Sequence, residues 1–226
     1  MKRVLREAVQ DARAILIEVW RLAKRRWVWL VLVAIVVAGA VFAVYPHDRE
    51  LYERITTDRV ENLIKVSNKF RRWGDFRDTV TITLLVFAVG WVAKKRTWRT
   101  AAVGCFIAAC VAGLMINAVR FTSGRPRPRT DMPDGFYGPT VDYEMQSFPS
   151  GHAGTSSGCG VSLAIALPAA GIFAFLSGAG VVWSCLYSGV HYVTDVLVGG
   201  TIGITMGILF GVVTRRRMKK LLEDSG

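Results

Sequence analysis

Long apolar runs alternate with short polar stretches along the whole chain. The first run, residues 27–45, has no charged side chain over 19 positions, which is enough for a helix to cross the hydrocarbon core of a bilayer. Further runs cover residues 79–93, 100–119, 152–167, 169–187 and 192–214. We therefore predict an all-α fold, a bundle of six transmembrane helices, in which the short run at 79–93 needs support from its neighbours.

Two further segments place apolar residues at helical spacing among charged ones. In residues 1–26 the charged positions are mostly basic, which is typical of an interfacial helix lying on the cytoplasmic leaflet. Residues 48–73 show a similar pattern and are expected to cap the opposite side of the bundle. For both segments, direct packing on the bundle is an equally good interpretation of the same pattern.

The basic residues indicate how the helices are oriented. The formal net charge is +12, and most Lys and Arg residues stand before residue 27, in the turn 94–99, or after residue 214. Under the positive-inside rule these three segments are cytoplasmic. The opposite face then receives three segments, residues 46–78, 120–151 and 188–191. The first of them also carries several basic residues, and we keep its assignment because the three basic segments named above agree with one another.

This pattern divides the chain into three parts. They are a cytoplasmic amphipathic segment (1–26), a six-span membrane domain (27–214) and a cytoplasmic basic tail (215–226). A cleaved secretory signal does not fit, since the basic leader of the first run is too long. With 52% hydrophobic residues and a mean hydropathy of +0.34, the chain is too apolar for an ordinary soluble domain. We expect an integral protein of a bacterial inner membrane, and the sequence carries no signal for an oligomeric state.

A cluster of arginines follows the third apolar run and comprises Arg120, Arg125, Arg127 and Arg129. The prolines between them block a helix and hold the backbone extended. Arginine forks match phosphate oxygens and stay protonated, so this cluster predicts a phosphate site. A basic patch that contacts lipid headgroups is an alternative interpretation of the cluster taken alone.

The sequence Pro149-Ser150-Gly151-His152 leads directly into the fourth run. Ser150 is a favourable N-cap, and the free N–H groups of a helix that begins here face any bound anion. His152, in the first turn, is placed to donate a proton to a leaving oxygen. An N-cap with an incidental histidine is the alternative.

His191 and Asp195 stand four positions apart at the head of the sixth run, so we expect them to share one helix face. A carboxylate there can hold the Nδ1 proton of the imidazole and leave Nε2 to attack phosphorus. An ionisable pair at the head of a membrane span favours a functional role, because its burial is costly. A structural His–Asp pair is the alternative. The third histidine, His47, has no such context.

In this order and spacing, the three stretches resemble the membrane-bound branch of the type 2 phosphatidic acid phosphatase (PAP2) family, which is related to the vanadium haloperoxidases. The family pattern is Lys-x6-Arg-Pro, then Pro-Ser-Gly-His, then Ser-Arg-x5-His-x3-Asp, and the resemblance covers residues 120–200. It implies a phosphatase of lipid phosphates that needs neither metal nor cofactor. Its active site would lie on the extracytoplasmic loops.

The resemblance also implies roles for single residues. His191 would be the nucleophile that forms a phosphohistidine, Asp195 would orient it, and His152 would protonate the leaving group. The phosphoryl oxygens would be held by Arg120, Arg127, Ser150 and the Gly151 amide.

Two positions depart from the family pattern. Arg120 stands where the family has lysine, which keeps the charge. Cys185 stands where the third motif has arginine, and loss of one such donor typically costs about 2.7–4 kcal/mol of transition-state stabilisation. We expect another cation to fill the gap. The nearest candidates in the sequence are Arg125 and Arg129, and Arg120 itself reaches further than the family's lysine. Arg125 is therefore among the predicted substrate-binding residues.

The expected partner is a lipid phosphate or diphosphate within the bilayer, and the charge distribution argues against nucleic acid. Two alternatives stay open. One is a phosphotransferase that uses the same intermediate, and the other is a catalytically attenuated protein that binds anionic lipid, as Cys185 would allow. The sequence does not distinguish among phosphatidate, phosphatidylglycerophosphate, undecaprenyl diphosphate and lipid A as substrates.

Overall fold

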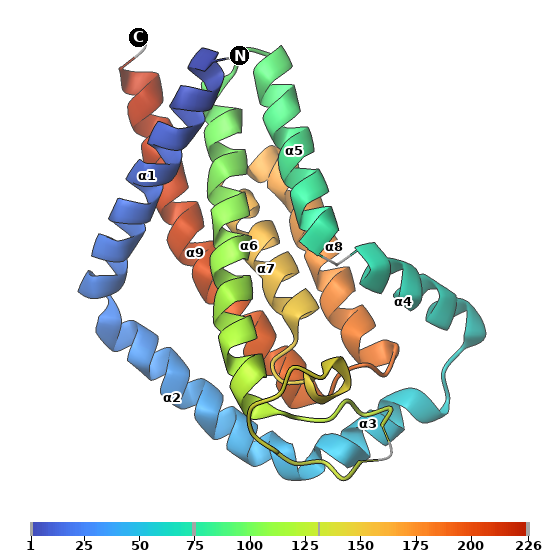
Figure 1. Ribbon diagram of the computed structural model, residues 1–226. Coiled ribbons are helices and arrows are strands. Elements are labelled where there is room, and N and C mark those ends of the chain that lie inside the picture. The colour runs from blue at the N-terminus through green and yellow to red at the C-terminus, as the bar shows by residue number, and fades with distance from the viewer. Residues whose placement is uncertain (1, 74–75, 131, 225–226) are drawn as a thin grey trace.

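Every apolar run of the sequence forms a helix (Figure 1). The computed structural model describes residues 2–73, 76–130 and 132–224, and this part of the chain contains no strand, which confirms the all-α prediction. The helices are α1 (Lys2–Arg25), α2 (Trp27–Val44), α3 (Asp48–Thr57), α4 (Glu61–Trp73), α5 (Phe76–Val92), α6 (Arg96–Ser123), α7 (Gly151–Ala166), α8 (Pro168–Tyr187) and α9 (Val193–Glu223). Two short 3-10 helices are η1 (Tyr45–His47) and η2 (Tyr143–Met145).

Several helical stretches in the described part of the chain are long and apolar enough to cross a membrane. There are 4 of them, Trp27–Thr57, Arg96–Ser123, Pro168–Tyr187 and Val193–Glu223. Helices α5 and α7 have 17 and 16 residues, fewer than the roughly 20 that a straight crossing needs. The membrane-spanning character is therefore confirmed, whereas the count of six crossings stays a prediction.

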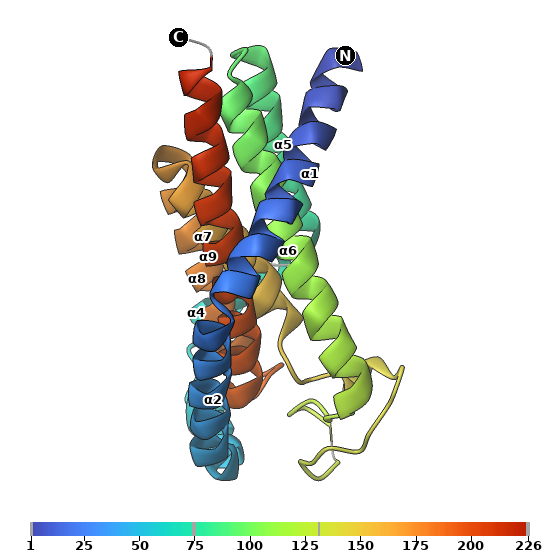
Figure 2. The same cartoon turned by 90° about the vertical axis from the view of Figure 1, so that its left-hand side faces the viewer.

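Helices α5 to α9 run side by side along the long axis of the bundle (Figures 1 and 2). Helix α7 lies among them and packs against α6, α8 and α9. The two chain termini lie at one end of the bundle, and the irregular residues 124–130 and 132–150 lie at the other (Figure 1). The turn between α8 and α9 is at this second end, so all three motif stretches gather there.

Close contact between α7 and α9 depends on glycine. A Cβ atom at Gly203 would lie 2.2 Å from the carbonyl oxygen of Gly154, and one at Gly199 would lie 2.3 Å from that of Ser150. Backbones approach this closely only where small residues line both helices. These two glycines of α9 therefore serve helix packing.

Gly203→Ala should destabilise the protein, because the added methyl group overlaps the backbone of α7. Overpacking of this kind costs about 1–3 kcal/mol, which should appear as a lower melting temperature of the purified protein in detergent. Gly39→Ala on α2 is the matched control, since a Cβ there has nothing within 4 Å. Equal melting temperatures for the two variants would contradict the role assigned to Gly203.

Helix α1 packs along the bundle. Ile15 is buried in one apolar cluster with Phe210 of α9. Asp11 is 2% exposed and pairs with Arg96 at 3.1 Å and with Arg217 at 3.0 Å. Residues 1–26 were open to two interpretations, an interfacial helix on the leaflet or a helix packed on the bundle. The structure shows the second.

The second amphipathic segment also packs on the bundle, since α4 lies against α8 and α3 contacts both α8 and α9. Helix α2 differs from its neighbours because none of its residues is buried. An apolar groove of about 770 Å³ lies between α2 and α9. The exposed apolar surface of α2 suits contact with lipid chains.

Candidate active site

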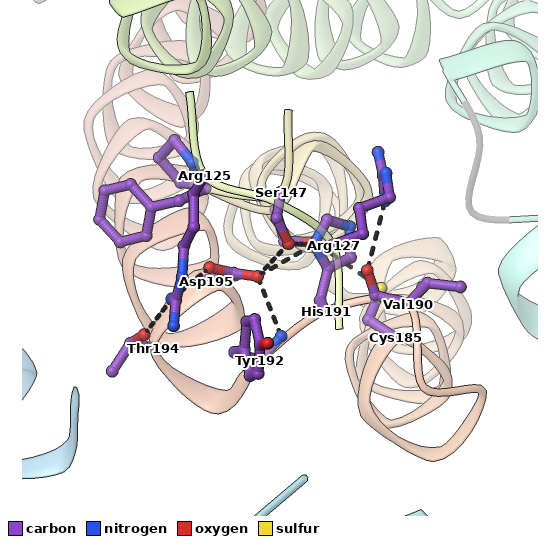
Figure 3. A network of polar contacts seen from close by, with 12 residues as sticks. Arg125, Arg127, Ser147, Cys185, Val190, His191, Tyr192, Thr194 and Asp195 are labelled. Atoms are coloured by element: carbon purple, nitrogen blue, oxygen red, sulfur yellow. Dashed lines mark hydrogen bonds and ion pairs between the residues drawn. The ribbon is translucent and has the colours of Figure 1, made fainter. Parts of the chain in front are cut away.

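The motif stretches are tied together by backbone hydrogen bonds. The amide of Ser150 donates to the carbonyl oxygen of Asp195 at 2.9 Å, and the amide of Ser147 donates to that of Arg125 at 3.0 Å. Figure 3 shows the resulting cluster, in which Arg125, Ser147, His191 and Asp195 lie close together. The loop after α6, the start of α7 and the start of α9 therefore form one site.

His191 and Asp195 form a buried pair. Nδ1 of His191 lies 3.4 Å from Oδ2 of Asp195, and both side chains are fully buried. Helix α9 begins at Val193, so His191 precedes the helix and the prediction of a shared helix face is wrong. The pair forms because Asp195, in the first turn, reaches back toward the preceding chain, where its Oδ2 also accepts the amide of Tyr192 at 2.9 Å.

The other ring nitrogen of His191, Nε2, is buried and has no hydrogen-bond partner among the described residues. Buried polar atoms are nearly always paired, so an unpaired one calls for a ligand or a catalytic explanation. The ring is held at Nδ1, which leaves Nε2 as the atom that can meet a substrate.

Ser147 belongs to this cluster, although the sequence analysis missed it. Its hydroxyl donates to Oδ2 of Asp195 at 2.5 Å and lies 3.4 Å from Nδ1 of His191. The side chain is fully buried. Ser147 fixes the carboxylate that faces the imidazole. It stands in an irregular loop, where no spacing distinguishes it from the other polar residues.

Burial lowers the pKa of His191 to about 4, from an ordinary value of 6.5. The hydrogen bond and charge of Asp195 act in the opposite direction, and the charges of Arg127 and Arg120 add to the lowering. The imidazole is therefore neutral at pH 7, and a neutral ring has the lone pair that a nucleophile needs.

Acid should therefore destabilise the protein through His191. Between pH 6.5 and about 4, the unfolded chain binds a proton that the folded chain does not, so the free energy of unfolding falls as the pH falls. Thermal unfolding in detergent across this range, for the wild type and His191→Gln, measures the effect. The melting temperature of the wild type should fall more steeply with acid than that of the variant. Parallel curves would contradict the neutral, buried imidazole.

Arg125 lies on the other side of the Asp195 carboxylate from His191 (Figure 3). Its Nη1 donates to Oδ1 of Asp195 at 2.7 Å. Its Nε and Nη2 donate to Asp134 at 2.9 and 2.7 Å, and Nη2 also donates to Asp48 at 2.9 Å. One buried arginine thus joins three carboxylates.

The predicted substrate-binding role of Arg125 does not match this placement. With a further bond from Nη1 to the hydroxyl of Thr194 at 2.7 Å, every N–H of the guanidinium is engaged. No donor remains for a phosphate. The structure instead places Arg125 where it orients the Asp195 carboxylate.

Asp48 is a second residue that the sequence analysis missed. It is fully buried. Its Oδ1 accepts the amide of Thr194 at 3.1 Å, and its Oδ2 accepts the hydroxyl of the same residue as well as Arg125. Asp48 therefore satisfies a free N–H at the start of α9 and fixes the helix end that carries Asp195.

Arg127 is bound to the backbone. Its Nε donates to the carbonyl oxygen of Tyr143 at 3.1 Å, and Nη1 and Nη2 donate to those of Val190 and Gln146 at 3.3 and 3.4 Å. The residue is 2% exposed, and burial lowers its pKa. No carboxylate within the described residues pairs with it. Its charge is therefore available to an anion.

Helix α7 begins at the second motif as predicted. Ser150 is its N-cap, and its Oγ accepts the amide of Ala153 at 3.4 Å. Arg120 lies over Gly151, since a Cβ there would be 3.0 Å from Nη2 of the arginine. Its Nε donates to the carbonyl oxygen of Pro149 at 3.0 Å. A guanidinium and a helix N-terminus, which both favour anions, are thus adjacent.

His152 lines a cavity of about 490 Å³ together with Arg120 and Gly151. The rest of the lining is largely apolar and comes from Phe76, Cys110, Gly113, Leu114, Ile116, Asn117 and Thr155. The cavity therefore combines a cationic end with apolar walls. His191 is not among the described residues that line it, so the structure does not bring the two histidines onto one cavity wall.

Cys185 is fully buried, with Sγ 3.8 Å from Oγ of Ser150. Of the predicted replacements for the motif arginine, Arg129 pairs with Glu144 on the surface at 2.5 Å. Arg125 is engaged by carboxylates, as described above. Both guanidinium groups are therefore held by carboxylates.

Comparison with known proteins identifies relatives. The PAP2 superfamily matches residues 99–219, slightly more than half of the chain. Decaprenylphosphoryl-5-phosphoribose phosphatase of Mycobacterium tuberculosis is 31% identical over 144 residues, which are 62% of this chain and 75% of that protein.

Solved structures share the fold. A transmembrane PAP2-type phosphatidylglycerolphosphate phosphatase from Bacillus subtilis has a TM-score of 0.59 at 21% identity, over 87% of this chain and 96% of that chain. LpxE from Aquifex aeolicus has a TM-score of 0.50 at 21% identity, over 72% of this chain and 93% of that chain. With its family match and its relative in Mycobacterium tuberculosis, this chain belongs to the PAP2 superfamily.

Proposed function

We propose that the protein removes phosphate from a membrane lipid phosphate or diphosphate through a phosphohistidine intermediate. The observation that carries the proposal is Nε2 of His191, which is buried without a partner in the described part of the chain while Nδ1 faces Asp195. Arg120 and Arg127 pair with no carboxylate of that part of the chain. They supply the positive charge that a phosphoryl group requires.

The reaction consists of two displacements at phosphorus. Nε2 of His191 attacks, the bond between phosphorus and the lipid oxygen breaks, and His152 gives its proton to that oxygen. Asp195 accepts the Nδ1 hydrogen bond and stabilises the charged ring. Water then attacks the phosphohistidine while His152 takes up its proton, the N–P bond breaks, and inorganic phosphate leaves. The phosphoryl oxygens are held by Arg120, Arg127, Ser150 and the Gly151 amide.

The substrate class is an amphiphilic phosphate. The cavity beside His152 has a cationic end at Arg120 and apolar walls from α5 and α6, as a headgroup attached to a lipid chain requires. By their names, the relatives act on lipid-linked phosphates, namely decaprenylphosphoryl-5-phosphoribose and phosphatidylglycerolphosphate. These two lipid classes are therefore the first to test.

The proposed topology has six crossings, α2 and α5 to α9, with both termini in the cytoplasm. The site then faces the periplasm or the outside of a bacterial inner membrane. Support comes from the arrangement in Figure 1, where the termini and the site lie at opposite ends of the bundle. The basic residues 94–99 and 215–220 stand at the end that holds the termini.

The test is phosphate release by the purified full-length protein in detergent, with EDTA present, from polyprenyl and glycerolipid phosphates. Release from at least one lipid class, undiminished by EDTA, is expected. If no lipid is hydrolysed while a control phosphatase hydrolyses each in the same micelles, the proposal is wrong. Phosphate recovered on an added alcohol acceptor in preference to water would make the protein a transferase. Binding without turnover would make it a lipid-binding protein.

A further inference from the structure

Cys185 stands where the family's third motif has an arginine, so the site lacks one cation. No other residue of the three motifs is free to replace it. Arg120 and Arg127 already stand at the positions of the first motif. Arg125 and Arg129 are engaged by carboxylates. A phosphoryl group in transfer carries charge on three oxygens, and a site that has lost one guanidinium stabilises it less well. A replacement must therefore come from another element.

Helix α4 is the element fixed beside this space. At its start, the amide of Val60 donates to the hydroxyl of Tyr187, the last residue of α8, at 3.0 Å. Further along, the ring of Phe70 packs edge-on against Trp183 with centroids 6.4 Å apart. A Cβ atom at Gly180 would lie 2.5 Å from the same Phe70 ring. Helix α4 thus runs closely along the last turns of α8, which carry Cys185.

Arg71 stands on the face of α4 that meets α8. Ser67, one turn earlier on the same face, is fully buried. Nε of Arg71 is buried and has no hydrogen-bond partner among the described residues. Its charge acts on the Cys185 thiol, as do the charges of Arg127 and Arg120. Three guanidinium groups therefore lie near enough for their charges to act on the position from which the motif arginine is missing.

We propose that Arg71 binds the phosphoryl group in place of the arginine that Cys185 replaces. The inference rests on the proposed phosphatase function and adds a phosphate-binding residue to that site. The unpartnered Nε favours it, because a buried guanidinium donor without a partner costs free energy unless an anion satisfies it. Within the described residues, Arg71 makes no ion pair, in contrast to Arg125. It also precedes the family match at 99–219, so no motif could reveal it.

The test compares Arg71→Gln with Arg72→Gln, its exposed neighbour on α4. Arg71→Gln should lower kcat about 100-fold, as loss of one oxyanion donor does. It should also weaken inhibition by orthovanadate, a mimic of the transferring phosphoryl group, while the melting temperature stays within a few degrees. Arg72→Gln should leave all three properties as in the wild type.

Cys185→Arg in the Arg71→Gln background should recover at least part of the lost kcat, because the two positions serve the same phosphate. If wild type and Arg71→Gln are equally active, or if vanadate inhibition is unchanged when activity falls, the assignment of Arg71 is wrong. A folded double variant with no recovery would also overturn it. If the double variant unfolds, the vanadate result for Arg71→Gln alone decides. An inactive wild type would instead overturn the phosphatase function.

Discussion

His191→Gln should abolish phosphate release while the protein stays folded and still binds lipid phosphate. The glutamine amide is no nucleophile, so the two-step route is closed, and we expect kcat to fall about 10⁴-fold or more. The bound lipid should be retained, because the arginines that hold the phosphoryl oxygens are unchanged. Initial rates of phosphate release in detergent, with equilibrium binding of the same lipid, measure both effects.

Trapping the intermediate makes this prediction specific to a phosphohistidine. Wild-type protein quenched into alkali during turnover should carry phosphate, because phosphohistidine survives alkali, whereas His191→Gln should carry none. His47→Gln is the matched control, since His47 is exposed and lies 3.8 Å from Glu50, outside the site. Turnover by His191→Gln within tenfold of the wild type, or a phosphoenzyme in that variant, would exclude His191 as the nucleophile.

The sequence predicted the helices well because each must bury its backbone polar groups within one apolar run. The fourth run, expected at residues 152–167, is α7 at Gly151–Ala166. The number of crossings is harder to predict, since α5 and α7 are short and their depth depends on neighbouring helices. The position of α1 does not follow from the sequence for a similar reason. An apolar stripe packs equally well on a leaflet and on a bundle.

The proximity of the motif residues could be predicted, because the helices between the three motif stretches place all three at one end of the bundle. Ser150 and Asp195 are joined by a backbone bond of 2.9 Å, and His191 meets Asp195. Their supporting residues could not be predicted. Asp48 is 77 positions from Arg125, and no spacing in the sequence indicates that the two side chains meet. A sequence shows how many charges a segment has, but not which of them pair.

The partners of Arg125 could not be predicted from the sequence either. Replacing Arg125 distinguishes a substrate-binding role from a structural role. A substrate-binding arginine would raise KM when replaced and leave the ligand-free protein stable. An arginine that joins three carboxylates would destabilise the protein without any ligand. Its full burial, with 2.7 Å to both Asp195 and Asp134 and 2.9 Å to Asp48, favours the second outcome.

Arg125→Gln should therefore cost about 3–5 kcal/mol of stability, because the carboxylates of Asp48 and Asp195 stay buried without their cation. Misplacement of Asp195 should also lower kcat about 10–100-fold in whatever fraction remains folded. Arg129→Gln is the control, since its pair with Glu144 is exposed and such pairs contribute at most about 1 kcal/mol. Melting temperatures of ligand-free protein in detergent measure the difference. If the Arg125→Gln protein is stable and its KM is raised, Arg125 binds the substrate. Its contacts with the carboxylates would then contribute little to the position of Asp195.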